Sequence, residues 1–199
     1  MRIEFFFDCS SPWTYLAFHN FVAMSEELSF QVEWKPILVG GVFNTVNPSV
    51  YANRDNPVPA KARYQTKDMM DWAAFSGIEI NWPMTVFPVN SVKAMRGCIV
   101  AGEQGKLVPF ARAVFEAYWG EDKNISRDDV LAEIAEVCGL DPAVMATRIA
   151  DDDIKAELRA NTEELVNRNG FGSPTIYLNG DDMYFGNDRL PLVRAKLTA

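Results

Sequence analysis

The stretch Phe7-Asp8-Cys9-Ser10-Ser11-Pro12-Trp13-Thr14-Tyr15-Leu16 joins an apolar segment to a helical one, and it decides the fold expected for the chain. Residues 2–7 hold three phenylalanines and an isoleucine, which predicts a short buried strand. Ser11 suits a helix N-cap and Pro12 the first helical position, so we predict a helix from Trp13 to about Met24. Apolar and polar residues alternate over 30–34, which predicts a second strand parallel to the first.

The period changes after this strand–helix–strand unit. Residues 39–59 are rich in Gly, Asn and Pro and predict a long loop, whereas residues 60–169 show helical spacing. Within that region we expect a helix that ends before Gly120, one capped by Ser126, one opened by Asp141-Pro142, and one over 151–169 with Gly170 as its C-terminal cap. The middle of the chain is therefore expected to be helical.

Strand character returns near the C-terminus. Residues 175–178 and 183–185 are expected strands, and Asn179-Gly180-Asp181-Asp182 between them is a strong hairpin signal. A last helix is expected over about 188–197. The whole predicts an α/β fold: a mixed sheet from residues 1–45 and 170–199, interrupted by a loop and an all-helical insertion over 46–169.

Composition and charge exclude several classes of function. The chain has 199 residues with 19 Lys and Arg against 27 Asp and Glu, so its net charge of −8 opposes binding to nucleic acids or anionic membranes. No apolar run is long enough to span a membrane. His19 is the single histidine, which excludes a multi-histidine metal site; on an apolar helix we expect it to pack rather than act as a base. No nucleotide-binding glycine motif occurs.

The three cysteines, Cys9, Cys98 and Cys138, form no disulfide or metal-binding pattern. Sparse, unpaired cysteines are typical of a reducing compartment, so we expect a cytoplasmic protein. Cys9 lies two residues before Ser11 at the end of the first strand, and we expect a buried, unreactive thiol there.

Three places carry the candidate chemistry. Ser11 stands at a helix start, where free N–H groups and the helix dipole stabilise an anion such as a thiolate; helix capping alone is the alternative. Ser173-Pro174 opens a strand, and a cis bond there would leave the Ser173 N–H and C=O free for a peptide-like ligand. Asn187 and Asp188 begin the last helix, where capping is again the simpler explanation.

Taken together and in this order, these features resemble the DsbA-like branch of the thioredoxin fold. Within that branch the chain is similar to the 2-hydroxychromene-2-carboxylate isomerase family, which is related to the kappa-class glutathione transferases. The family pattern at the first site is met by Phe7, Asp8, Ser11, Pro12, Thr14 and Tyr15. Further similarity covers 34–43, Asn53-Arg54-Asp55 and Asp71-Trp72-Ala73.

The resemblance implies a glutathione-dependent cis–trans isomerase that acts on a small aromatic carboxylate. A thiolate adds reversibly to the conjugated substrate, whose double bond becomes single and can rotate. Ser11 is the implied catalytic residue. The implied glutathione contacts are Ser11, Asn53, Ser173, Pro174, Asn187, Asp188, Arg189 and Leu190, and the implied substrate contacts are Asn44, Asn53 and Arg54.

One departure from the family concerns the substrate. Some members carry a lysine where this chain has Asn44, so the exact substrate is open, and Lys61 is the nearby candidate replacement. Trp82-Pro83 and Phe87-Pro88 join helices of the insertion and are candidates for an apolar pocket wall or for scaffold packing. Since family members are often dimers, a homodimer is the assembly to look for.

Three alternatives remain at the level of the sequence. A kappa-like glutathione transferase shares the whole thiolate site and differs only in its acceptor pocket. A non-catalytic module that binds thiol peptides is the second. A thiol–disulfide oxidoreductase is the least favoured, because Ser11 and Thr14 stand where such enzymes have their two cysteines and cannot form a disulfide.

Overall fold

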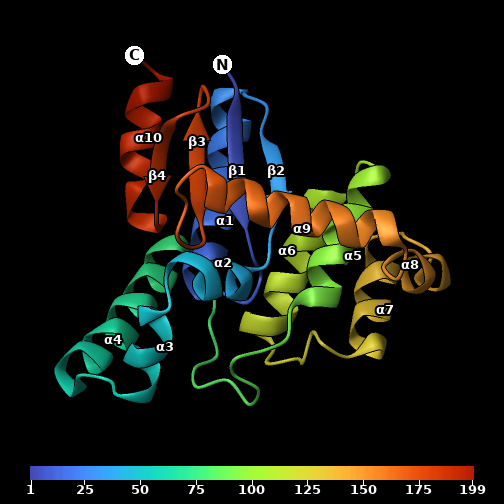
Figure 1. Ribbon diagram of the computed structural model, residues 1–199, viewed down its shortest axis with the longest axis horizontal. Helices are drawn as coiled ribbons and strands as arrows, with labels where there is room; N and C mark the ends of the chain where they lie inside the picture. The colour runs from blue at the N-terminus through green and yellow to red at the C-terminus, as the bar shows by residue number, and fades with distance from the viewer.

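A four-stranded mixed sheet forms the centre of the protein (Figure 1), in a computed structural model that describes residues 1–199. The strand order is β2-β1-β3-β4, with β2 parallel to β1 and with β3 antiparallel to both β1 and β4. The strands are β1 (Ile3–Phe7), β2 (Glu33–Pro36), β3 (Thr175–Leu178) and β4 (Asp182–Phe185). The expected α/β, thioredoxin-like sheet and the hairpin between its last two strands are confirmed.

Helices cover both faces of the sheet and fill the chain between β2 and β3. Their bounds are α1 (Pro12–Leu28), α2 (Val39–Val46), α3 (Ser49–Asp55), α4 (Pro59–Ser76), α5 (Val92–Glu103), α6 (Leu107–Phe115), the π-helical η1 (Glu116–Gly120), α7 (Asp128–Val137), α8 (Pro142–Arg148), α9 (Asp152–Asn167), the 3-10 helix η2 (Asn187–Arg189) and α10 (Leu190–Leu197). The expected helical insertion is therefore confirmed, and the expected last helix is divided into η2 and α10.

Alternation along β1 sends its side chains to two different layers, since successive side chains of a strand point to opposite faces. Phe5 and Phe7 belong to the large core cluster that includes α1, whereas Phe6 packs in a second, smaller cluster with Leu165 of α9. Figure 1 shows α9 crossing one face of the sheet and α1 lying behind the other. All five residues of β1 are buried, so this strand is the centre of both layers.

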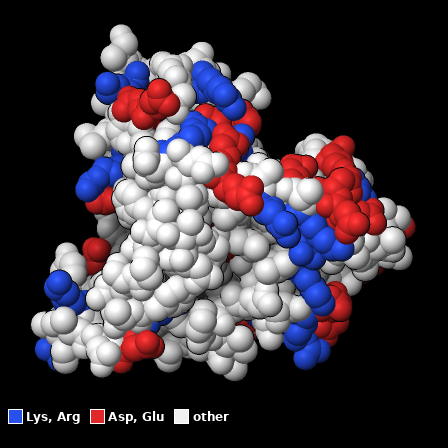
Figure 2. Space-filling view, viewed as in Figure 1, with Lys and Arg blue, Asp and Glu red and all other residues white.

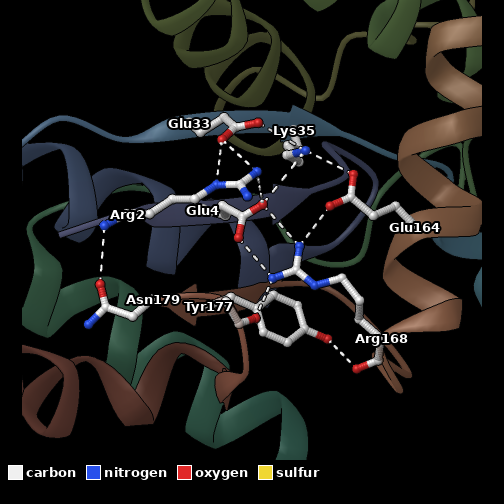
Figure 3. Close-up of polar contacts among 9 residues, drawn as sticks. Arg2, Glu4, Glu33, Lys35, Glu164, Arg168, Tyr177 and Asn179 are labelled. Atoms are coloured by element: carbon white, nitrogen blue, oxygen red, sulfur yellow. Dashed lines mark hydrogen bonds and ion pairs between the residues drawn. The ribbon is translucent and has the colours of Figure 1, made fainter.

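A buried carboxylate ties α9 to the sheet (Figure 3). Glu4 of β1 is fully buried, and its two oxygens accept hydrogen bonds from the Arg168 guanidinium at 2.9 and 2.8 Å. Arg2 lies 2.9 Å and Lys35 3.7 Å from the same carboxylate. Arg168 also stacks on Tyr177 of β3, with its guanidinium carbon 3.9 Å from the ring centroid. Because a buried charge needs compensation, this network fixes how the end of α9 sits on the sheet.

Two expected elements near the N-terminus are wrong in position or type. The second strand covers Glu33–Pro36 rather than 30–34, because β1 offers a parallel partner only from Glu4, which pairs with Glu33. The expected loop over 39–59 instead holds α2 and α3. Gly41 is a packing residue of α2: a Cβ there would lie 3.2 Å from the Thr162 side chain of α9. The glycine at position 41 is therefore explained by close packing of α2 against α9, and it does not indicate a loop.

Two expected helix caps are also wrong. Ser126 does not cap α7; its hydroxyl donates to Asn124 Oδ1 at 2.6 Å, and the helix starts two residues later at Asp128. At the end of α9 the left-handed conformation falls on Asn169, with φ 63°, and not on Gly170. A Cβ on Gly170 would lie 2.1 Å from Leu165 Cδ1, so this glycine is required by close packing. The expected caps Ser11 and Asp141 are confirmed.

No helix of the structure has both the length and the apolar composition needed to cross a bilayer. In the view of Figure 2, charged side chains gather along α9 and around α8, whereas the area over α2 is largely uncharged.

Candidate active site

Ser11 occupies the N-cap of the 17-residue helix α1, as the sequence predicts. Its Oγ accepts the Thr14 N–H at 3.3 Å and donates to the Ser173 carbonyl at a long 3.5 Å. The neighbouring Trp13 N–H has no acceptor in the structure. The start of α1 therefore presents a hydroxyl and a free N–H together with the positive end of the helix dipole, an arrangement that stabilises an anion.

Ser173 lies directly against this helix start. The Ser173-Pro174 peptide bond is cis, as predicted, and the Ser173 N–H has no hydrogen-bond acceptor. The Ser173 side chain is held from two sides: its Oγ lies 2.8 Å from Thr14 Oγ1 and accepts the Asp8 N–H at 3.1 Å. A fixed backbone donor with no partner in the protein is available to a ligand that presents a carbonyl.

One cavity of about 790 Å³ contains both features, a size within the range of small-molecule sites. Its walls come from five parts of the chain: the start of α1, the segment from Leu38 through α3, one side of α4, the connection between α4 and α5, and the turns around β3 and β4. Trp82 and Phe87 line it and meet edge to face, with ring centroids 5.1 Å apart. The sequence favoured scaffold packing for these two aromatic residues and left a cavity wall as the alternative; in the structure both line the cavity.

Arg54 is the one basic residue among those that line the cavity. Its guanidinium carbon lies 5.6 Å from the centroid of the Phe87 ring, and it takes part in none of the ion pairs of the protein. Asn53, on the same helix α3, also lines the cavity. A guanidinium without an acidic partner, beside aromatic rings, suits an aromatic carboxylate through its paired N–H donors.

Other residues implied by the resemblance lie away from this cavity. Asn44 on α2 and Lys61 on α4 are exposed and do not line it. Asn187 is buried and turned toward α1, where its Oδ1 accepts from Asn20 at 3.5 Å, and its Nδ2 has no partner. The Asn187 side chain faces α1 because η2, which carries Asn187, packs against that helix.

The remaining C-terminal residues are also outside the cavity walls. Asp188 pairs with Arg189 at 2.8 Å on the surface, and Leu190 is part of the core. Pro174 contributes the cis bond and not a wall of the cavity. The structure thus brings together Ser11, Ser173, Asn53 and Arg54, and it leaves Asn44, Asn187, Asp188, Arg189 and Leu190 apart from them.

The titratable residues near the helix start behave differently from Ser11. Cys9 is fully buried, as expected, and burial raises the pKa of its thiol, with Cys98 and Asp8 adding to the effect. His19 lies outside the cavity, and partial burial lowers the pKa of its imidazole. Neither residue has access to a ligand in the cavity.

Asp8 entered the sequence analysis only as part of the family pattern, with no role of its own, and Ser91 did not enter it, although both line the cavity. Asp8 is fully buried, and this burial raises the pKa of its carboxyl above the ordinary value. An aspartate that directly follows the apolar run Phe5-Phe6-Phe7 was the available signal. Ser91 had none, because its place in the cavity depends on how the insertion folds back.

Comparison with known proteins agrees with the fold. The profile of the DSBA-like thioredoxin domain matches residues 2–198. A 2-hydroxychromene-2-carboxylate isomerase of Pseudomonas sp. strain C18 is 28% identical over 188 residues, which cover 94% of this chain and 86% of that protein. Glutathione S-transferase kappa 2 of Caenorhabditis elegans is 27% identical over 206 residues, covering 96% and 89%.

Among solved structures, a 2-hydroxychromene-2-carboxylate isomerase superposes with a TM-score of 0.86 at 26% identity. The superposition covers 100% of this chain and 95% of that one. The buried β1, the helix start at Ser11 and the cis Ser173-Pro174 bond all lie within the matched profile. By its sequence and its structure, the chain belongs to the DSBA-like thioredoxin domain family.

Proposed function

We propose that this protein is a glutathione-dependent cis–trans isomerase that converts 2-hydroxychromene-2-carboxylate to trans-o-hydroxybenzylidenepyruvate, or acts on a similar intermediate of aromatic catabolism. Relatives that carry this isomerase name match almost the whole chain, and a structure of such an enzyme superposes along its full length. The observation that carries the proposal is the single cavity that joins an anion-stabilising helix start to an unpaired arginine.

The residues present fit a bound glutathione. The unpartnered Ser173 N–H would pair with its peptide backbone, and Asn53 would add a polar contact from α3. The Ser11 hydroxyl and the Trp13 N–H would face its sulfur at the helix start. No protein thiol competes at this point, because Ser11 and Thr14 cannot form a disulfide and Cys9 is buried.

Bound as a thiolate, glutathione would supply a nucleophile whose reversible addition makes the substrate double bond single for rotation. The chain contributes the rest. Ser11 donates a hydrogen bond to the sulfur anion and so lowers the energy of the charged form. Arg54 binds the substrate carboxylate, and Trp82 and Phe87 offer ring faces to its aromatic part.

A kappa-like glutathione transferase is the second candidate. The observation in its favour is that kappa-class relatives match the chain about as fully as the isomerases do, at 27% and 24% identity. Both activities use the same thiolate site and differ in whether the thiol adduct is released or reverts.

Turnover of the chromene carboxylate, followed by its absorbance with and without added glutathione, separates these candidates. We expect conversion only when glutathione is present, with no loss of free thiol over many turnovers. Arg54→Gln should raise the KM for the carboxylate and leave the affinity for glutathione unchanged. Stoichiometric consumption of the thiol with an electrophilic aromatic halide, without any isomerisation, would instead establish the transferase.

A further inference from the structure

Asp8 is a buried carboxyl group without a counterion. It is the one acidic side chain among the residues that line the cavity, it is 1% exposed, and it takes part in none of the ion pairs of the protein. The other ionisable side chains of the cavity are Tyr51 and Arg54, both on α3. Buried carboxylates are normally paired with a cation, so an unpaired one at a candidate site needs an explanation.

Hydrogen-bond donors from separate segments converge on this carboxylate instead. Its Oδ1 accepts the Ser10 N–H at 2.9 Å, and its Oδ2 accepts the Val39 N–H, the first residue of α2, at 2.8 Å. The Ser91 side chain, just before α5, lies beside the same group and acts to lower its pKa. The Asp8 side chain thereby links the turn before α1 to the start of α2, and it also lies next to the segment before α5.

The backbone of Asp8 extends this linkage to the ligand-binding groups. Its N–H donates to Ser173 Oγ at 3.1 Å, and its carbonyl accepts the Ser11 N–H at 3.3 Å. Ser173 carries the unpartnered N–H, and Ser11 carries the hydroxyl that accepts from Thr14. The orientation of both donors therefore depends on where the Asp8 residue is held.

We propose that Asp8 is a positioning residue: its side chain holds the β1–α1 turn to the start of α2, and so aligns the Ser11 hydroxyl with the Ser173 N–H toward one point in the cavity. The expected effect of Asp8 on turnover rests on the proposed function. Its expected effect on the ligand-free protein does not. An asparagine at this position would accept fewer of these N–H groups, because its amide has one acceptor oxygen and a donor NH₂ group. An ionised carboxylate accepts on both oxygens and has no donor.

Asp8→Asn tests the role, and Asp141→Asn is the matched control. Asp141 caps α8, far from the cavity in the chain, and its carboxylate likewise accepts two backbone N–H groups, those of Ala143 and Val144. Hydrogen exchange of the ligand-free proteins should show faster exchange at Ser10, Val39 and Thr14 in Asp8→Asn, by more than about tenfold. The amides of β3 should follow only the global stability. Asp141→Asn should affect Ala143 and Val144 alone.

Kinetics supply a second readout. Because small displacements of aligned groups can cost about 10²-fold in rate, Asp8→Asn should lower kcat by about tenfold to 100-fold. The KM for the chromene carboxylate should stay near that of the native protein, since Arg54 lies on α3 and has no bond to Asp8. Asp141→Asn should keep the native kcat. Ser91→Ala removes a hydroxyl beside the Asp8 side chain and keeps Asp8 itself, so it should give a smaller loss of kcat and serves if Asp8→Asn does not fold.

The outcomes distinguish this inference from the proposed function. Native exchange at Thr14 and Val39 in a folded Asp8→Asn protein overturns the positioning role whether or not the enzyme is an isomerase. Faster exchange with an unchanged kcat also overturns it. A native protein that neither binds nor uses glutathione defeats the proposed function, and the exchange measurements then still decide whether Asp8 orients Ser11.

Discussion

Ser11 is the residue whose loss should separate function from folding most clearly. Ser11→Ala removes the hydroxyl donor beside the proposed thiolate, and losing one aligned donor to an anion costs about 10²–10³ in rate. Folding should lose only about 1 kcal/mol, because the hydroxyl caps α1 through one bond to Thr14. The measurement is turnover at saturating glutathione together with urea unfolding. Ser126→Ala, whose hydroxyl serves only Asn124, is the control and should turn over normally; equal rates in the two variants would contradict the role of Ser11.

For the replacement of Cys9 we predict the opposite result, although Cys9 lies only two residues from Ser11. Its thiol is fully buried beside Cys98, and burial raises its pKa, so no thiolate is available there. Cys9→Ala should therefore keep turnover per folded molecule close to that of the native protein. A rate loss as large as that of Ser11→Ala, in a protein with native circular dichroism, would make Cys9 the nucleophile.

Asp8 should also leave a signature in the pH dependence of stability. Burial raises the pKa of its carboxyl in the folded state, so the folded protein holds this proton at a pH where the unfolded chain has released it. The Asp8 contribution to the free energy of unfolding therefore falls as pH rises through the range above the unfolded pKa. As the pH rises above about 4, the native protein should therefore lose stability relative to Asp8→Asn. Parallel urea midpoints across that range would show that the Asp8 pKa is not raised.

At the scale of elements, α9 is a part of the insertion that contacts both the sheet and a segment of the cavity wall. Its Thr162 accepts the Leu38 N–H at 3.0 Å, next to the Val39 that Asp8 binds. Arg168, just beyond the helix, holds Glu4 of β1. Arg168→Met should lower the free energy of unfolding by about 3 kcal/mol, because it leaves a fully buried carboxylate poorly compensated.

The matched control for that element is Arg194→Met on α10. Arg194 makes the same paired contact, with Glu27 at 2.7 and 2.6 Å, but both side chains are exposed. An exposed pair contributes about 1 kcal/mol or less, so this substitution should be nearly neutral. Similar urea midpoints for the two variants would mean that the Glu4 network does not anchor α9.

Elements that are determined by local sequence were predictable. The apolar β1, the Ser11-Pro12 helix start and the Asn179-Gly180 hairpin all depend on neighbouring residues, and each is in place. The helices α2 and α3 were not, since their Gly, Asn and Pro content is typical of loops and only packing against α9 explains Gly41. A local pattern cannot report a contact with a residue more than a hundred positions away.

At the scale of the whole molecule, the site also divides into residues that local sequence predicts and contacts that only the complete fold creates. Ser11 and Ser173 were predictable because a helix start and a residue before a strand proline are local features. The hydrogen bond from Val39 to Asp8 and the position of Ser91 beside Asp8 were not, because they bring residues far apart in the chain to the end of the first strand. The cavity exists only in the complete fold, since its walls come from both ends of the chain and from the helices between them.

The central claim, that this fold holds a glutathione thiolate at the start of α1, is tested most directly by titrating the bound thiol. Ultraviolet absorbance of the thiolate, measured on the complex from about pH 5 to about pH 9, gives its pKa against a free thiol value near ~8.5. The pKa of the bound thiol should lie well below that of free glutathione, and Ser11→Ala should move it back upward. A bound thiol that titrates like free glutathione, or a titration that Ser11→Ala leaves unchanged, would contradict the account.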